Sequence, residues 1–424
     1  MNVTIIPQKL NGIIDAIPSK SHAHRVLIAQ KLAQLQGQQR PDPLEIPSFS
    51  QDIIATKNCL AQLDKEFPYL DCKESGSTLR FMIPVAMALK ESATFLGAGK
   101  LTYRPISPLK EEMEEHGCVF HMNDVNKNIS DKYKEICTIN GRLRPGHYRL
   151  AGNISSQFIT GLLFALPLLS DDSTLELTTK LESAGYVDLS LDVLREFGIE
   201  IRQEHNENGC IVYHIPGNQI YCEPDGLTIE GDWSNACFWL AAGALNGNVT
   251  CRGLNMDSSQ RDKEFVQILQ DMGASITIEG DRRNASVTSQ AMILDAAEVS
   301  VSQIPDVVPI LAAVMALSDG ASMITDAGRL KIKESDRLQT VYETLSRLGG
   351  DITYGGESLS ITGLPSLEGG TVSSHNDHRI AMTAAIASCG CRNEVTIEHA
   401  EAVRKSYPNF FEDFTALGGK VTGL

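Results

Sequence analysis

The feature that most constrains the fold of this 424-residue chain is an internal repeat, with a spacing of roughly 70 to 80 residues. In each copy a helical apolar pattern ends at a glycine, and residues that alternate between apolar and polar follow it. The glycines are Gly117, Gly198, Gly273, Gly349 and Gly418. Glycine readily adopts the left-handed conformation that ends many helices, and the period changes there from 3.6 residues to 2. Each copy therefore predicts a helix, a glycine cap and a strand.

A second and more hydrophobic helix is predicted upstream of the capped helices. Its first turn is polar in six places, at Pro18–Arg25, Glu74–Arg80, Gly152–Phe158, Gly231–Phe238, Gln303–Pro309 and His375–Met382. Phe158–Leu169 and Ile310–Leu317 continue as segments that are apolar on every side. Such a helix must be buried on every side. We therefore expect a unit of strand, buried helix, strand, outer helix and strand, present in six copies.

Six units in a chain of this length predict two domains, because single hydrophobic cores stop growing well before 424 residues. We expect an α/β protein of two similar domains with three units each, the buried helices inside and the sheets outside. Pro216–Gly226, rich in Pro, Gly and Asn, is the predicted crossover between units three and four. Parallel buried helices have their N-termini at one end, where each favours an anion by about 0.3–1 kcal/mol. If the domains face each other, these ends line one cleft.

The charge balance argues against nucleic acid as a partner. The chain has 53 acidic and 37 basic side chains, a net charge of −16, whereas phosphate backbones are bound by surfaces with a basic excess. A small anionic substrate is compatible, because it responds to the local field of a cleft. The ten cysteines lack zinc-site spacing, and His22 and His24 lack a third ligand nearby, so we expect reduced thiols and no metal. No secretory signal or membrane span is predicted, which indicates a soluble, cytoplasmic protein.

Charged side chains are concentrated in Leu330–Leu338, which contains Lys333, Glu334 and Arg337. Taken alone, this stretch is also compatible with a capped helix in which Glu334 and Arg337 pair within one turn. Asp306 precedes an entirely apolar helix, where the helix dipole favours an acid. A partly buried Asp306 beside Lys333 would instead take a proton from a substrate hydroxyl. Both interpretations fit these residues.

Other predicted helix starts have more polar groups than capping requires. One hydroxyl suffices as a cap, yet Ser155, Ser156 and Gln157 occur together. Gly76 allows backbone N–H groups to approach a ligand closely. Further candidates for holding anions are Lys20, Ser21, Arg25, Arg104, Ser183, Tyr186, Arg379 and Lys405. Together these residues predict a site that holds anions and moves a proton.

As an ordered set, these motifs resemble the enolpyruvyl transferase family. KSxxxR, SGSTLR, SSQ, SAGY, IPD, KIKESDR, NDHR and RKSYP occur in family order between Pro18 and Pro408. The resemblance implies two domains, each an inside-out α/β barrel of three βαβαββ-type units. It assigns residues 1–19 and 227–424 to a phosphoenolpyruvate-side domain and residues 20–226 to a shikimate-3-phosphate-side domain. It also implies that the domains close on the substrates like a hinge.

By this resemblance, the enolpyruvyl group of phosphoenolpyruvate moves to the 5-hydroxyl of shikimate 3-phosphate and phosphate leaves, a step of aromatic amino acid biosynthesis. Asp306 is the implied base, Glu334 the acid that protonates the methylene carbon, and Lys20 stabilises charge on the adduct. A monomer without metal or redox cofactor is implied. Shikimate 3-phosphate is implied to meet Lys20, Ser21, Arg25, Ser155, Ser156, Gln157, Ser183, Tyr186, Asp306 and Lys333. Phosphoenolpyruvate is implied to meet Lys20, Gly76, Arg104, Gln157, Arg337, Arg379 and Lys405.

Five positions depart from the commonest family pattern. Glu74 and Arg329 replace a frequent Asn, Phe81 replaces a frequent Pro, and His22 and His24 occupy positions that are often small or amidic. We expect the reaction to be retained. Because the family glycine at Gly76 leaves room for glyphosate, a herbicide that mimics phosphoenolpyruvate, we also expect this herbicide to inhibit.

Three alternatives are weighed against this resemblance. The sister enzyme that acts on UDP-N-acetylglucosamine typically carries a Cys five residues before the arginine that matches Arg104, where this chain has Gly99. The net charge of −16 opposes a nucleic-acid-end binder such as an RNA phosphate cyclase. A phosphate-binding protein without enzymatic activity would require neither Asp306 nor Glu334.

Overall fold

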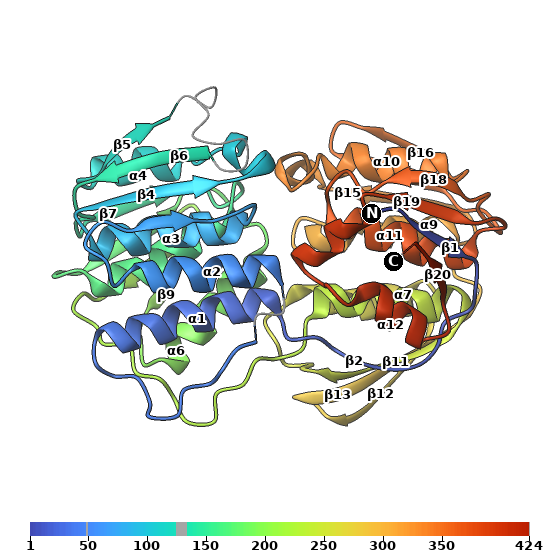
Figure 1. Ribbon diagram of the computed structural model, residues 1–424, viewed down its shortest axis with the longest axis horizontal. Helices are drawn as coiled ribbons and strands as arrows, with labels where there is room; N and C mark the ends of the chain where they lie inside the picture. Colours follow the sequence, from blue (N-terminus) through green and yellow to red (C-terminus); the bar gives the residue numbers. More distant parts are fainter. Residues whose placement is uncertain (48–49, 124–133, 424) are drawn as a thin grey trace. The chain divides into compact units, whose positions relative to one another are not determined.

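The structure is a computed structural model that describes residues 1–47, 50–123 and 134–423. The chain forms two compact units. Unit 1 consists of Met1–Ser19 and Glu230–Leu424, and unit 2 of Lys20–Ile229. The second boundary follows Ile229, whereas the sequence placed it after Gly226. Figure 1 shows the N-terminal strand, in dark blue, among the red strands of the C-terminal part.

Unit 1 contains three four-stranded sheets that share one topology. In each sheet the first two strands are parallel, and the third and fourth join them antiparallel. The strands are, in order across each sheet, β2 (Asn11–Asp15), β11 (Asn248–Leu254), β13 (Asn284–Gln290) and β12 (Ser275–Asp281); β14 (Glu298–Ser300), β15 (Ala321–Thr325), β17 (Ser358–Thr362) and β16 (Asp351–Gly355); and β18 (Gly370–Ser373), β19 (Val395–Glu398), β1 (Val3–Ile6) and β20 (Lys420–Thr422).

Unit 2 contains two sheets of the same topology within the described residues. Their strands are β3 (Tyr69–Asp71), β4 (Ser92–Gly97), β6 (Lys134–Asn140) and β5 (Val119–Met122); and β7 (His147–Leu150), β8 (Ser173–Leu177), β10 (Ile211–Ile215) and β9 (Arg202–His205). The helices of unit 2 are α1 (Lys20–Leu35), α2 (Gln51–Gln62), α3 (Gly76–Leu89), α4 (Leu109–Glu115), α5 (Ser156–Ala165) and α6 (Ala184–Glu196).

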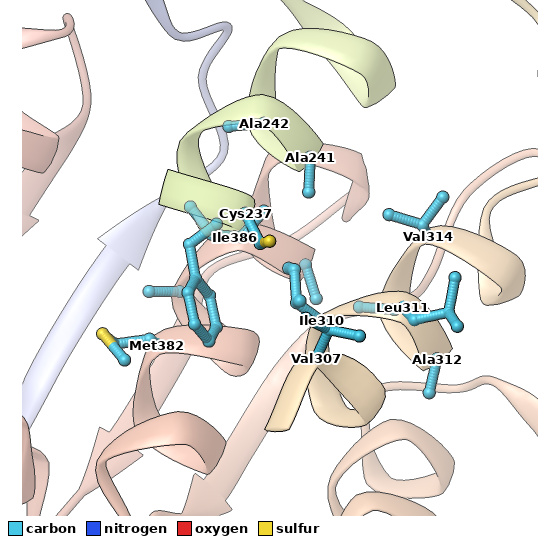
Figure 2. Close-up of a cluster of buried hydrophobic side chains, with 14 of the residues drawn as sticks. Cys237, Ala241, Ala242, Val307, Ile310, Leu311, Ala312, Val314, Met382 and Ile386 are labelled. Carbon is cyan, nitrogen blue, oxygen red and sulfur yellow. The ribbon is translucent and has the colours of Figure 1, made fainter. Parts of the chain in front are cut away.

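Three buried helices, α7 (Trp233–Asn246), α9 (Val308–Ala316) and α11 (His378–Ala387), form the core of unit 1, as the sequence predicted. More polar helices accompany them, α8 (Glu264–Asp271), α10 (Arg337–Arg347) and α12 (Phe410–Ala416). Every residue of α9 and α11 is buried. Side chains of α7, α9 and α11, among them Cys237, Ile310 and Ile386, meet between these helices (Figure 2). Removing this apolar surface from water stabilises the unit by roughly 25 cal/mol per Å² buried.

The glycine caps predicted from the repeat are confirmed. Gly117, Gly198, Gly273, Gly349 and Gly418 have φ angles of 98°, 79°, 94°, 91° and 96°. Each lies two residues after the last residue of α4, α6, α8, α10 or α12. A residue with a Cβ is strained at these angles, so glycine sets the end of each outer helix.

The structure corrects the predicted number of units from six to five within the described residues. The helix pair α1 and α2 stands where the sixth was expected, and residues 36–47, the described part of their connection, contain no strand. Three prolines in this connection cannot donate to a sheet ladder. The connection is held instead by Glu223, whose Oε1 accepts hydrogen bonds from Gln30 Nε2 at 2.6 Å and from the Leu44 amide at 3.3 Å.

The cysteines are free thiols, as the sequence analysis expected, and eight of the ten are buried. In the portions of the chain that the structure describes, the helices are too short or too polar to cross a lipid bilayer.

Candidate active site

The candidate residues of unit 2 lie at helix N-termini that are joined to one another. Lys20 Nζ of α1 and Asp52 Oδ2 of α2 are 2.9 Å apart, and Arg80 Nη1 of α3 donates to Gln157 Oε1 of α5 at 2.7 Å. The N-terminal turns of these helices therefore lie together, as expected from the sequence. Their combined dipoles favour an anion there.

Arg25 joins α1 to α6 through a guanidinium whose orientation is fixed. Nε donates to Ser190 Oγ at 2.8 Å, Nη1 to the Ser21 carbonyl at 2.6 Å and Nη2 to the Tyr186 carbonyl at 2.7 Å. Its central carbon lies 5.3 Å from the centroid of the Phe81 ring, a cation–π contact. Burial lowers the pKa of Arg25 to about 9, so the side chain is cationic at neutral pH. Phe81, which departs from the family pattern, thus supports a candidate binding residue.

Gly76 lies against two guanidinium groups at the start of α3. A Cβ at this position would be 2.5 Å from Arg104 Nη1 and 3.2 Å from Arg80 Nη1. Gln157, which accepts from Arg80, also donates from Nε2 to Ser77 Oγ at 2.9 Å. Two cations and a helix N-terminus therefore meet at a residue without a side chain, an arrangement suited to a phosphate or a carboxylate.

The remaining candidates of unit 2 begin α5 and α6. Ser155 caps α5, because its Oγ accepts a hydrogen bond from the Gln157 amide at 3.3 Å. Ser156 follows within the first turn and is buried. Ser183 precedes α6 with a φ of 54°, in the left-handed region that a non-glycine residue seldom adopts. Such strain persists only where the surrounding contacts maintain it.

In unit 1 the candidates gather around the carboxylate of Asp306, which lies in the 3-10 turn η4 (Pro305–Val307) before α9. Oδ1 accepts from Lys333 Nζ at 3.1 Å and from Arg337 Nη1 at 2.8 Å, and Oδ2 accepts from Arg379 Nη2 at 3.2 Å. The contact between Asp306 and Lys333 that the sequence suggested is therefore present. Three cations around one carboxylate favour its ionised form, which is the form that a general base requires.

Arg337 connects three carboxylates and is almost fully buried, with 1% of its side chain exposed. Besides Asp306, it donates from Nε to Asp377 Oδ2 and from Nη2 to Glu334 Oε2, both at 2.8 Å. Burial by itself lowers the pKa of Arg337, but the charges of Asp377, Glu334 and Asp306 outweigh burial and hold it above its usual value. Burial by itself raises the pKa of Asp377, but Arg337 outweighs it and holds the pKa below 3.8. The pair is therefore ionised.

Two candidate lysines belong to this end of unit 1: Lys333, which contacts Asp306, and Lys405. Burial, reinforced by the charges of Arg329 and Arg337, lowers the pKa of Lys333 although Asp306 opposes the change. Lys405 ends the 3-10 helix η7 (Ala400–Lys405) and donates to the Asn376 carbonyl at 2.8 Å, next to the start of α11. Both cations can therefore serve a bound anion at this end of the unit.

Asp262, in the 3-10 helix η3 (Arg261–Lys263), is a second buried carboxyl group near Asp306. It accepts a hydrogen bond from the Ser234 hydroxyl in the first turn of α7. Burial, followed by the charge of Asp306, raises the pKa of Asp262 to about 6, although Arg379 and the Ser234 hydrogen bond oppose the rise. Asp262 therefore exchanges a proton near neutral pH, unlike the ionised Asp377.

Sequence reasoning did not select Asp52, Arg80, Asp262 or Asp377. Asp377 lies within the NDHR motif, two residues before Arg379, so its acidic character was visible. Its structural role depends on its contact with Arg337, which is 40 residues away in the chain. No local pattern predicts that contact.

A known protein family matches most of this chain. A model of the family described as EPSP synthase (3-phosphoshikimate 1-carboxyvinyltransferase) matches residues 51–414. The chain belongs to the EPSP synthase family. A relative named 3-phosphoshikimate 1-carboxyvinyltransferase from Clostridium perfringens (strain 13) is 40% identical, with 98% of each chain covered. One of the same name from Clostridium kluyveri is 42% identical, with 99% of this chain and 98% of the relative covered.

The fold is also that of solved EPSP synthases. The structure of EPSP synthase from Acinetobacter baumannii matches with a TM-score of 0.77 and 21% identity, and the match covers 100% of both chains. This EPSP synthase family member therefore combines a mixed α/β fold with two cationic groups of residues, one around Asp306 and one around Gly76.

Proposed function

We propose that the protein transfers the enolpyruvyl group of phosphoenolpyruvate to the 5-hydroxyl of shikimate 3-phosphate and releases phosphate, in aromatic amino acid biosynthesis. Membership of the EPSP synthase family and the names of its relatives support this assignment. The observation that carries it is the carboxylate of Asp306 held by Lys333, Arg337 and Arg379. An ionised base beside three cations suits a reaction of anionic substrates in which a hydroxyl proton is removed.

The proposed chemistry is addition followed by elimination. Glu334 protonates the methylene carbon of phosphoenolpyruvate, Asp306 takes the proton of the attacking hydroxyl, and Lys20 stabilises charge on the tetrahedral adduct. In the elimination, Glu334, left as a carboxylate by the first step, takes a proton back from the methyl group of the adduct. The C–O bond to phosphate breaks, phosphate leaves, and the enolpyruvyl double bond is restored. Arg337 Nη2 holds the Glu334 carboxylate at 2.8 Å. A substrate carboxylate that took the place of Glu334 on Arg337 would free the Glu334 carboxyl group, which could then take up a proton and deliver it.

The proposed binding residues come from both units. For shikimate 3-phosphate they are Lys20, Ser21, Arg25, Ser155, Ser156, Gln157, Ser183, Tyr186, Asp306 and Lys333. For phosphoenolpyruvate they are Lys20, Gly76, Arg104, Gln157, Arg337, Arg379 and Lys405. We further propose that unit 1 is the phosphoenolpyruvate-side domain, that unit 2 is the shikimate-3-phosphate-side domain, and that each is an inside-out α/β barrel. The enzyme is proposed to be a cytoplasmic monomer that glyphosate inhibits, without metal or redox cofactor.

A phosphate-release assay tests the function. Purified protein is expected to release phosphate only when both phosphoenolpyruvate and shikimate 3-phosphate are present. Release with UDP-N-acetylglucosamine in place of shikimate 3-phosphate would assign the chain to the sister reaction. Binding of both substrates without any release would indicate a phosphate-binding protein.

A further inference from the structure

A chain of buried hydrogen bonds crosses the N-terminal ends of α1, α2 and α3. His24 Nδ1 lies 2.7 Å from Thr56 Oγ1, and Thr56 Oγ1 lies 2.7 Å from Thr78 Oγ1. Thr78 Oγ1 donates to Ser75 Oγ at 2.8 Å, and Ser75 caps α3 by accepting from the Thr78 amide at 3.2 Å. All four side chains are at most 1% exposed. These hydrogen bonds therefore connect His24, a position in α1 that departs from the family pattern, to Ser75, the residue before Gly76.

The number of available protons fixes the direction of this chain. The Thr78 hydroxyl donates its proton to Ser75, so it can only accept from Thr56. Thr56 then has no proton left for His24, and His24 Nδ1 must carry the proton that Thr56 accepts. Within the described residues, His24 Nε2 is buried and has no hydrogen-bond partner. Burial, followed by the charges of Lys20 and Arg25, holds the pKa of His24 well below 6.5, so the ring is neutral.

His24 also repeats, one turn later, the contact that Lys20 makes. Lys20 meets Asp52 at 2.9 Å, and His24 meets Thr56, so both partners advance by four residues. Two such contacts on successive turns fix the register of α1 against α2. Thr78 extends this register to the first turn of α3.

We propose that His24 is a positioning residue for enolpyruvyl transfer, and that it fixes the start of α3 for binding of phosphoenolpyruvate. The claim rests on the proposed function. Ser75 precedes Gly76, and a Cβ at Gly76 would already be 2.5 Å from Arg104 Nη1. A small displacement of this turn therefore changes the space between the α3 backbone and the guanidinium group. Arg25 holds α1 to α6 through separate hydrogen bonds to Ser190 and Tyr186, so the proposed contacts to shikimate 3-phosphate do not depend on His24.

The test compares KM values for the two substrates. His24→Leu removes the Nδ1 donor, and Thr56→Val removes the hydroxyl that accepts it. Each is expected to raise KM for phosphoenolpyruvate about fivefold to tenfold, while kcat and KM for shikimate 3-phosphate change less than about twofold. His24→Asn is expected to restore KM, because its amide nitrogen can occupy the place of Nδ1. The double variant His24→Leu/Thr56→Val is expected to behave like either single variant.

A buried threonine of unit 1 provides the matched control. Within the described residues, Thr344 Oγ1 has no hydrogen-bond partner, so Thr344→Val removes a hydroxyl without breaking a connection. A parallel rise of both KM values, a loss of thermal stability alone, or failure of His24→Asn to restore KM would overturn the inference. If His24→Leu does not fold, Thr56→Val decides. An inactive wild-type protein would refute the proposed function, whereas an active wild type with unchanged variants would refute only the role of His24.

Discussion

Replacing Asp377 with Asn tests whether the buried Arg337 pair organises unit 1. The Asp377 carboxylate is fully buried and accepts from Arg337 Nε at 2.8 Å, Arg337 Nη2 at 3.2 Å and Ser335 Oγ at 3.0 Å. Asn keeps one acceptor oxygen and the ability to cap α11, but it loses the charge. One charge-assisted hydrogen bond contributes about 1.5–3 kcal/mol.

Arg337 still contacts Glu334 and Asp306 in this variant. The loss of folding stability is therefore smaller than the roughly 3–5 kcal/mol expected for a buried charge left without any partner. We expect Asp377→Asn to lower the free energy of unfolding by about 2–3 kcal/mol at pH 7. Urea unfolding followed by tryptophan fluorescence measures this directly, because both tryptophans, Trp233 and Trp239, belong to α7 of unit 1.

Asp336→Asn is the matched control. Asp336 caps α10 by accepting from the Gln339 amide at 3.3 Å, and Asn caps a helix about as well as Asp. The control is expected to change the free energy of unfolding by less than about 0.5 kcal/mol. Equal effects of the two substitutions would refute the claim that Asp377 holds Arg337.

The pH dependence gives a second check on the same pair. Because Arg337 holds the pKa of Asp377 below 3.8, the folded state binds the proton more weakly than the unfolded state. The stabilisation is therefore fully present above pH 3.8 and is lost as the pH falls through the folded-state pKa. The difference between wild type and Asp377→Asn is expected to be constant from pH 5 to 8.

Two further predictions concern Gly76 and Asp262. Gly76→Ala is expected to raise KM for phosphoenolpyruvate severalfold with little loss of stability, because the added Cβ meets the flexible end of Arg104; an unchanged KM in steady-state assays would contradict this. The pKa of Asp262 is raised to about 6, so stability falls as pH rises from about 4 to 6. Asp262→Asn is expected to remove this slope and to stabilise the protein at pH 8 by roughly 1–3 kcal/mol, which urea unfolding across that pH range measures; a slope unchanged from wild type would refute the assignment.

Features that depend on one residue or its near neighbours in sequence were predicted, whereas most contacts between distant residues were not. The glycine caps were predicted because a cap depends on φ at one residue, as the value of 98° at Gly117 illustrates. The contact between Lys333 and Asp306 was anticipated because both residues lie just before a helix, Asp306 before α9 and Lys333 before α10. By contrast, the Arg337–Asp377 pair depends on how α10 and α11 pack, which no local pattern encodes.

The incorrect count of units has a physical origin as well. The helix that begins at Lys20 shares a polar first turn with the other buried helices, and this similarity suggested a sixth unit. The capped glycine and the alternating strand that mark the other five units do not recur after α2. Counting the caps rather than the polar helix starts would have given five.

The central claim is that the Asp306 carboxylate accepts the hydroxyl proton of shikimate 3-phosphate. Phosphate release by wild type and by Asp306→Asn, with both substrates saturating, tests it most directly. A general base contributes about 100-fold to 10,000-fold, so we expect turnover to fall by that factor while shikimate 3-phosphate still binds in a calorimetric titration. Turnover of Asp306→Asn within a few-fold of wild type would contradict the account.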